Sequence, residues 1–254
     1  TQLFQAHLRP GGRVLDLGAN VGWFAVQAIL AGCEVHAFEP VPGIADLTER
    51  NMQRAMEVGP GKGVLHRAAA GDAPGTATIV LGDGNHGDNR VVDGDAPADM
   101  ADNESIEIAI ERVDDHVQGP VDFLKVDTQG SEWLALQGAR KLLEASPSCG
   151  LLIEFWPYAL RGCKPGELLD LLMGMGFTLG KATEAPYPMT KQRLLDQALG
   201  LVGSERRSLE GMLDACEALG RTARAIACCE ALIAMTEGPP QAEFEERLAK
   251  LRGA

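Results

Sequence analysis

The stretch RVLDLGANVGWF, residues 13–24, leads from a short apolar run into an acid and then turns on glycine. The apolar residues before the turn predict a buried strand over residues 13–17, and those after it predict a helix over residues 21–31. A strand that breaks on glycine into a helix holds a nucleotide in several enzyme classes. The stretch therefore predicts a nucleotide-type ligand at this turn.

The sequence up to about residue 182 continues to alternate between these two patterns. Further strands are predicted at residues 34–40, 63–72, 76–81, 105–113, 121–127, 149–157 and 177–182, and further helices at residues 43–59, 131–145 and 165–176. Strands that alternate with helices form a mostly parallel sheet with helices on both faces. The sequence thus predicts an α/β, doubly wound, Rossmann-like fold.

Residues 82–104 interrupt this alternation with a segment rich in Gly, Asp and Asn. The segment is too long and too polar for a plain connector. Its composition fits either a functional lid or a disordered segment.

The composition changes after about Thr183, because no strand pattern follows. Helices are predicted at about residues 190–202, 205–219, 221–236 and 241–252. One helix pair resembles a tetratricopeptide repeat, but no clean 34-residue period supports it, and we favour a helical appendage that packs on the sheet or on another subunit. We therefore expect a catalytic domain over residues 1–184 and a helical module over residues 185–254.

The amino-acid composition and net charge of the chain disfavour some classes of binding partner. The chain has 254 residues, 45% of them hydrophobic, and a formal net charge of -13. Such an acidic chain disfavours nucleic acid and anionic membrane surfaces as partners, and no apolar run approaches the length of a membrane span. The six cysteines show no metal-ligand spacing, which indicates a reduced, cytoplasmic protein.

Two ligands compete for the turn after the first strand. A dinucleotide needs a glycine where this chain has Asn20, between Gly18 and Gly22. Asp16 disfavours two nearby phosphates and suits the ammonium and sulfonium of S-adenosylmethionine, while Glu39 ends the second strand and suits ribose hydroxyls. The pattern favours S-adenosylmethionine over a dinucleotide or a plain strand-to-helix turn.

Several segments, in this order, resemble the FkbM family of S-adenosylmethionine-dependent methyltransferases. They are VLDLGANVGWFAV, HAFEP, RAAAGD, GTATIVL, IERVDDHV, VDFLKVDTQGSEWLALQGARKLL and LLIEFWP. The resemblance covers about residues 10–182 and implies a class I methyltransferase fold with S-adenosylmethionine as methyl donor. We expect the donor to contact Asp16, Gly18, Ala19, Asn20, Gly22, Glu39, Pro40, Ala69 and Asp127.

The most specific block of the resemblance is LKVDTQGSEWLALQGA. The family usually has D-x-E-G where this chain has Asp127, Thr128, Gln129 and Gly130. The replacement leaves open any role that needs a charge at position 129, such as metal binding or proton acceptance. Because family members mostly methylate hydroxyl groups, often on sugars or sugar-bearing natural products, the resemblance implies the same class of acceptor.

Two carboxylates at strand ends are the first catalytic candidates. Asp127 could contact the donor, bind a divalent cation, act as base, or cap the following helix, for which Ser131 is the better cap. Glu154 ends an otherwise apolar strand, so its carboxylate needs a partner or a substrate. The two strands are expected to be neighbours, and a divalent cation shared by Asp127 and Glu154 is an open alternative.

The loop supplies a third candidate. Transfer of a methyl group requires a site that excludes water, so we predict that residues 82–92 line the acceptor side of the pocket, with His86 as general base. Trp156 and Tyr158 follow Glu154 and could wall this pocket or pack in the core. For the other histidines we expect His36 in the core, His66 in a structural role and His116 at the surface, and no role is assigned to His7.

The leading interpretation is an O-methyltransferase that acts on a hydroxyl of a sugar, glycan or glycosylated small molecule. The alternative is a methyltransferase-like interaction module without turnover, which binds a protein partner, or a second copy, through the helical tail. Gln129 keeps that alternative open, whereas the intact donor motif with Asp16 and Glu39 disfavours it. The glycine spacing disfavours a nicotinamide dehydrogenase.

Overall fold

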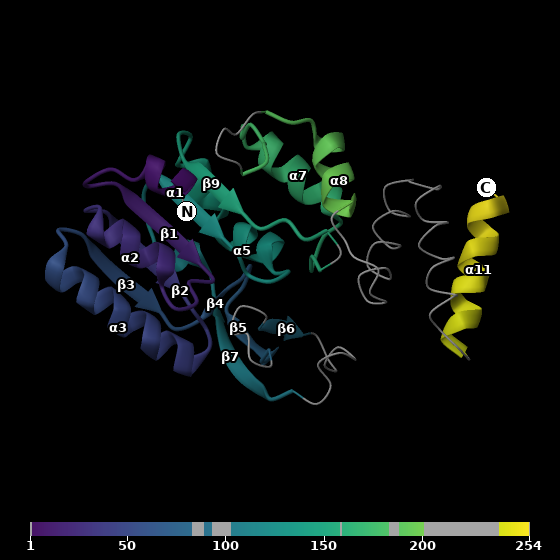
Figure 1. The fold of residues 1–254 in the computed structure, drawn as a ribbon, viewed down its shortest axis with the longest axis horizontal. Helices are drawn as coiled ribbons and strands as arrows, with labels where there is room; N and C mark the ends of the chain where they lie inside the picture. The colour runs from purple at the N-terminus through teal and green to yellow at the C-terminus, as the bar shows by residue number, and fades with distance from the viewer. Residues whose placement is uncertain are drawn as a thin grey trace. The chain divides into compact units, whose positions relative to one another are not determined.

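Figure 1 shows a computed structural model of the chain, which describes residues 2–82, 89–92, 103–157, 159–182, 188–200 and 239–253. The chain divides into two compact units. One comprises Thr1–Glu154 with Ala182–Pro186, and the other comprises Phe155–Lys181 with Tyr187–Ala254. The predicted domain boundary at residue 184 lies outside the described residues and stays a prediction.

The first unit is built on a parallel five-stranded sheet with the order β3-β2-β1-β8-β9. Its strands are β1 (Arg13–Leu17), β2 (Glu34–Phe38), β3 (Lys62–His66), β8 (Phe123–Val126) and β9 (Gly150–Ile153). Four of the five residues of β1 and all four of β8 are buried, as expected for central strands covered on both faces. The predicted parallel sheet is confirmed.

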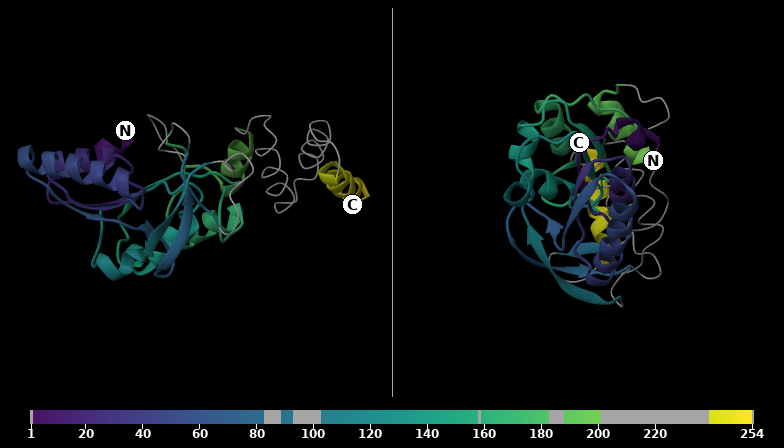
Figure 2. Two further views of the ribbon diagram at one scale, coloured as in Figure 1. Left: turned by 90° about the horizontal axis from the view of Figure 1, so that it is seen from below. Right: turned by 90° about the vertical axis from the view of Figure 1, so that its left-hand side faces the viewer.

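Helices cover both faces of this sheet, as the two views of Figure 2 show. Helix α2 (Trp23–Leu30) packs on β1 and β2, and α3 (Pro42–Val58) packs on β3. The short helices α4 (Val113–His116), α5 (Glu132–Gly138) and α6 (Arg140–Glu144) pack on one another, and α1 (Gln2–His7) buries Phe4 against the core. This arrangement confirms the predicted doubly wound, Rossmann-like α/β fold.

The strands that flank the polar segment form a second sheet with Arg90–Val92, a short strand within it. Strands β4 (Ala69–Ala70), β5 (Gly75–Val80), β6 (Arg90–Val92) and β7 (Ser105–Glu111) have the order β4-β7-β5-β6. Strand β7 pairs parallel with β4 and antiparallel with β5. Ile79 and Ile108 bury their side chains against Val41 and Ile44, which lie just beyond the end of β2. The second sheet thus packs next to the carboxyl end of the main one.

The strand order creates the crevice in which such folds hold ligands. The chain builds β1, β2 and β3 outward in one direction, and then returns to place β8 on the other side of β1. Ligands of open α/β sheets bind at this reversal, outside the carboxyl ends of the strands. The loops after β1, β2 and β8 are therefore the place to look for a site.

Three predicted elements need correction. Residues 177–182 form no strand, because Gly180 makes only an isolated bridge with Pro188, which has no N–H to extend a ladder. The helix predicted over residues 131–145 breaks at Ala139, whose φ and ψ of -105° and 13° are not helical. The third predicted strand ends at His66, and its continuation pairs with β7 instead.

The second unit contains α7 (Pro165–Gly174), α8 (Lys191–Gly200) and α11 (Pro239–Gly253). Helix α7 contacts α8, and Lys191 pairs with Asp170 at 2.5 Å. The helices predicted at residues 205–219 and 221–236, including the tetratricopeptide-like pair, lie outside the described residues. No helix in the described part of the chain has both the length and the apolar character to cross a membrane.

Candidate functional site

The turn after β1 lies across the carboxyl ends of three strands. Gly18, Asn20 and Gly22 all have left-handed backbone, with φ of 76°, 50° and 81°. The N–H groups of Gly18 and Ala19 both donate to the carbonyl of Phe38 at the end of β2. A Cβ on Gly18 would lie 1.9 Å from the carbonyl oxygen of Asp127 at the end of β8. Only glycine fits this position, because it lacks a side chain and tolerates the positive φ.

Glu39 joins the turn to the end of β2. Its Oε2 accepts from the N–H of Asn20 at 2.9 Å, and its Oε1 accepts from the N–H of Val41 at 3.0 Å. The residue is only 5% exposed, and this burial raises the pKa of the Glu39 carboxyl above its usual range, although both backbone N–H groups act in the opposite direction. Each carboxylate oxygen retains a lone pair for a ligand hydroxyl.

Asp16 lies beneath the turn instead of facing the crevice. Its side chain is fully buried, and its Oδ2 accepts from the N–H of Ala25 in α2 at 3.1 Å. Its Oδ1 lies 3.4 Å from the Nζ of Lys125. Burial raises the pKa of Asp16, and Lys125 opposes this. In this structure the carboxylate fixes the start of α2, and its contact with the donor stays a prediction.

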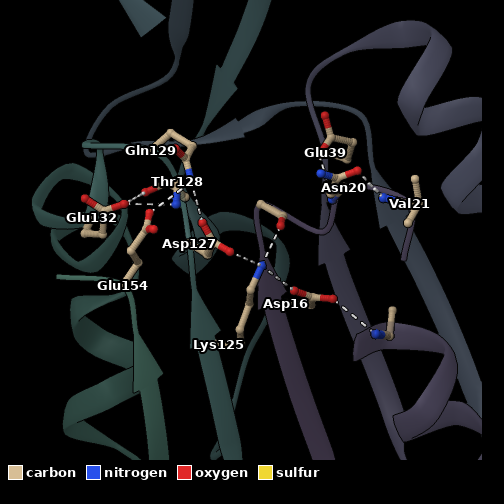
Figure 3. A network of polar contacts seen from close by, with 12 residues as sticks. Asp16, Asn20, Val21, Glu39, Lys125, Asp127, Thr128, Gln129, Glu132 and Glu154 are labelled. Atoms are coloured by element: carbon tan, nitrogen blue, oxygen red, sulfur yellow. Dashed lines mark hydrogen bonds and ion pairs between the residues drawn. The ribbon is translucent and has the colours of Figure 1, made fainter. Parts of the chain in front are cut away.

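Lys125 is the central cation of the network in Figure 3. Its Nζ donates to the carbonyl oxygen of Gly18 at 2.6 Å and lies within ion-pair distance of both Asp16 and Asp127. The residue is 4% exposed in a strand whose other members are apolar. The sequence did signal it, as a lysine within a buried run, but our sequence reasoning overlooked it.

Gln129 bridges the two carboxylates that the sequence singled out. Its Nε2 lies 2.9 Å from Asp127 Oδ1 and 2.9 Å from Glu154 Oε2 (Figure 3). An amide NH₂ group donates two hydrogen bonds, one to each acid. The amide nitrogen thus stands between the carboxylates, where a shared cation would otherwise lie. Asp127 and Glu154 are brought together as predicted, while metal binding by them is not tested.

Glu154 has a carboxyl whose pKa is strongly shifted. The residue as a whole is exposed, yet its carboxyl is crowded by its surroundings. Loss of hydration, followed by repulsion from Asp127 and Glu132, raises the pKa of Glu154 to about 7. A carboxyl with this pKa can exchange a proton at neutral pH.

The loop that carries Gln129 is held by Glu132, a second residue that sequence reasoning missed. Glu132 Oε1 accepts from the N–H groups of Thr128 and Gly130 at 3.0 and 3.1 Å and from the hydroxyl of Thr128 at 3.2 Å. Gln129 has a φ of 51°, so the loop needs this support to hold a left-handed residue that is not glycine. Glu132 is fully buried, and this burial raises the pKa of its carboxyl.

These loops surround an open cleft. Six of the predicted donor residues line it, namely Gly18, Asn20, Glu39, Pro40, Ala69 and Asp127. Phe38, Val41, Ile79 and Val91 supply an apolar wall. Asp16, Ala19 and Gly22 support the turn from behind and do not line the cleft. The mix of apolar wall and buried carboxylate fits a nucleoside-bearing ligand.

The polar segment contributes to the same cleft. Asn89 and Val91 line it, and Asn89 Oδ1 accepts from the N–H of Gly82 at 2.9 Å. His86, the predicted base, lies outside the described residues, as does Tyr158. Trp156 belongs to the second unit, so its predicted part in the acceptor pocket is not tested.

Comparison with known proteins identifies the family. The Methyltransferase FkbM domain matches residues 16–179, which is well over half of the chain. The chain therefore belongs to the FkbM methyltransferase family, and S-adenosylmethionine is its cofactor. The residues of the cleft fit this cofactor, because the buried Glu39 carboxylate suits ribose hydroxyls and the apolar wall suits an adenine ring.

Solved structures of other methyltransferases resemble the chain at low identity. One is a TehB-like S-adenosylmethionine-dependent methyltransferase from Corynebacterium glutamicum, with 15% identity over 74% of this chain and 79% of that one, and a TM-score of 0.40. Another, from Thiobacillus denitrificans, was crystallised with S-adenosyl-L-homocysteine and has 15% identity, coverage of 98% and 80%, and a TM-score of 0.36. A search of curated protein sequences finds no match to the chain.

Proposed function

We propose that this methyltransferase transfers a methyl group to a hydroxyl of a sugar, a glycan or a glycosylated small molecule. The observation that carries the proposal is the position and pKa of Glu154. Its carboxyl is hydrogen-bonded to Gln129, which lines the cleft, and has a pKa of about 7. An alcohol is a poor nucleophile at neutral pH, so its methylation needs a proton acceptor of this kind.

The roles follow from the contacts. When bound, S-adenosylmethionine supplies a methyl group on a positively charged sulfur. Glu39 and the turn from Gly18 to Asn20 hold the donor, and Gln129 orients the carboxylate of Glu154 toward the acceptor. Glu154 takes the hydroxyl proton as the oxygen forms its bond to the methyl carbon, and the carbon–sulfur bond breaks. Alignment of the acceptor oxygen with the donor contributes several kcal/mol to the rate enhancement.

Asp127 and His86 have defined places in this proposal. Asp127 lines the cleft and is hydrogen-bonded to Gln129, so we assign it the positioning of donor and acceptor. His86 stays the alternative base predicted from the sequence. We do not favour the interaction module without turnover, because a chain that has lost catalysis has no need for a carboxyl tuned to pH 7 beside the cleft.

A labelled-methyl assay tests the proposal. The full chain is incubated with S-adenosylmethionine carrying a radioactive methyl group and a panel of glycosides, each paired with its deoxy counterpart. We expect label in glycosides and its loss when one particular hydroxyl is removed. Glu154→Gln should lower turnover by about 10²–10⁴. Label found on amine acceptors instead of hydroxyl groups would refute O-methyl transfer. A normal rate for Glu154→Gln together with an inactive His86→Ala variant would refute Glu154 as the base.

A further inference from the structure

A second cluster of ionisable side chains lies outside the cleft. His66 ends β3, Glu111 ends β7 and His116 ends α4. One ligand atom from each of the three lies within 4.8 Å of the other two. His116 Nε2 is 2.9 Å from Glu111 Oε2, and the rings of His66 and His116 have centroids 4.9 Å apart. None of the three lines the donor cleft.

Two further residues set the orientation of His66. Its Nε2 lies 3.1 Å from Nδ1 of His36, and Nε2 of His36 lies 3.6 Å from Glu34 Oε1. Because a carboxylate only accepts, the nearby Glu34 favours the His36 tautomer with its proton on Nε2, in which Nδ1 accepts from the Nε2–H of His66. This chain of contacts leaves Nδ1 of His66 as a lone-pair donor. A carboxylate or similar acceptor behind a histidine is how metal-ligating imidazoles are held in one tautomer.

We propose that His66, Glu111 and His116 form a binding site for a divalent cation of the zinc class, with His36 and Glu34 holding His66 in position. Two imidazoles and one carboxylate are a donor set that zinc takes, whereas magnesium and calcium take oxygen ligands. Bonds of about 2.0–2.1 Å in a tetrahedron place ligand atoms about 3.3 Å apart. The ligand atoms, now within 4.8 Å of one another, must therefore move closer together. The side chains of Glu111 and His116 are each about a third exposed, so they can rotate to do so.

Such an ion would connect the two sheets. His66 belongs to the main sheet, and Glu111 belongs to the second sheet. The ring of Phe38, which lines the donor cleft, stacks on His66 with centroids 4.3 Å apart and an interplanar angle of 16°. A cation bound at this site would therefore also fix one wall of the cleft, although it takes no part in the chemistry proposed there.

Cobalt titration of the tag-free, chelator-treated full chain tests the site, since cobalt(II) replaces zinc and absorbs in the visible range. We expect one equivalent to bind with the spectrum of a nitrogen and oxygen site, and zinc to displace it. Glu111→Gln and His66→Ala should weaken binding at least tenfold. His36→Ala should weaken it about 10–100-fold, as loss of an orienting partner does. His7→Ala, a histidine outside the cluster, should bind as the wild type does.

Absence of binding to the wild type, or equal binding to wild type and Glu111→Gln, would overturn the proposal. A near-ultraviolet charge-transfer band from sulfur to cobalt would also overturn it, because the cysteines would then be the ligands. His66 packs on Phe38, so His66→Ala could lose its fold. Glu111→Gln keeps the size of the side chain and decides the question in that case.

Discussion

The ammonium of Lys125 donates a hydrogen bond of 2.6 Å to the carbonyl oxygen of Gly18. The same Nζ lies 3.4 Å from Asp16 and 3.5 Å from Asp127. The ammonium of Lys125 thus balances the negative charges of two carboxylates and also holds the backbone turn that lines the cleft. Its removal should disturb stability and donor binding together.

Replacement of Lys125 by Met should strongly destabilise the protein. It leaves the fully buried Asp16 without its cation, and breaking a buried pair in this way costs about 3–5 kcal/mol. Urea unfolding measures the change, with Lys62→Met, an exposed lysine paired with Glu34, as control at under about 1 kcal/mol. The double variant Asp16→Asn, Lys125→Met should recover part of the loss, and equal stability of Lys125→Met and wild type would contradict the assignment.

Replacement of Glu39 by Ala should weaken the binding of S-adenosylhomocysteine. The expected loss is about 1–3 kcal/mol, the range for hydrogen bonds to a charged group, measured by isothermal titration. Glu49→Ala is a matched control on α3, because Glu49 is half-buried, does not line the cleft and pairs with Arg67. If the Glu39 and Glu49 variants bind equally well, the ribose contact is wrong.

The rate should follow the ionisation of Glu154. A base with a pKa of about 7 is active when deprotonated, so kcat/KM should rise with pH through about 7 and then level off. Glu154→Gln should remove this rise along with most of the rate. A profile of wild type with no inflection between pH 6 and 8 would exclude Glu154 as the base.

Stability should respond to pH at Glu154 with a defined sign. Its folded pKa of about 7 exceeds the ordinary 4.5, so the folded state holds the proton more tightly. The contribution of Glu154 to stability is then fully present below pH 4.5 and is lost as the pH rises through about 7. His66, with a pKa lowered to about 4, gives the opposite slope between pH 4 and 6.5. The difference between wild type and Glu154→Gln cancels the His66 term and isolates the Glu154 term.

Replacement of Gln129 by Glu restores the family's usual acid and removes the amide bridge. Three carboxylates would then crowd one loop, so the pKa of Glu154 should rise and the rate profile should shift to higher pH. We also expect the Gln129→Glu variant to bind Mg²⁺, which prefers carboxylate oxygens, while the wild type binds it at least tenfold more weakly. Equal Mg²⁺ affinity, measured by titration calorimetry, would show that the amide does not stand in for a cation.

Local signals predicted the elements of the fold and part of the site. Glu39 could be found because it follows a strand directly, and Asp127 because it ends an apolar run. Lys125 was overlooked because its neighbours in β8 are all apolar, so the run was interpreted only as a buried strand. The bridge from Gln129 to Glu154 and the meeting of His66 with His116 depend on strand order and side-chain rotation, which no local pattern specifies. The prediction of a strand at residues 177–182 was wrong, because a local sequence pattern does not show whether a neighbouring strand is present to pair with it.

The close approach at Gly18 has a consequence for the order of folding. The donor turn is completed by the end of β8, and the contact between Gly18 and Lys125 spans 107 residues of sequence. Contacts of such long range form late, because the loop between them must first be closed. A nascent chain that has only produced β1 to β3 thus carries the whole glycine motif but an unfinished turn. If the donor binds at this turn, we expect S-adenosylmethionine to stabilise the protein only after β8 has docked beside β1, and not to template the assembly of the sheet.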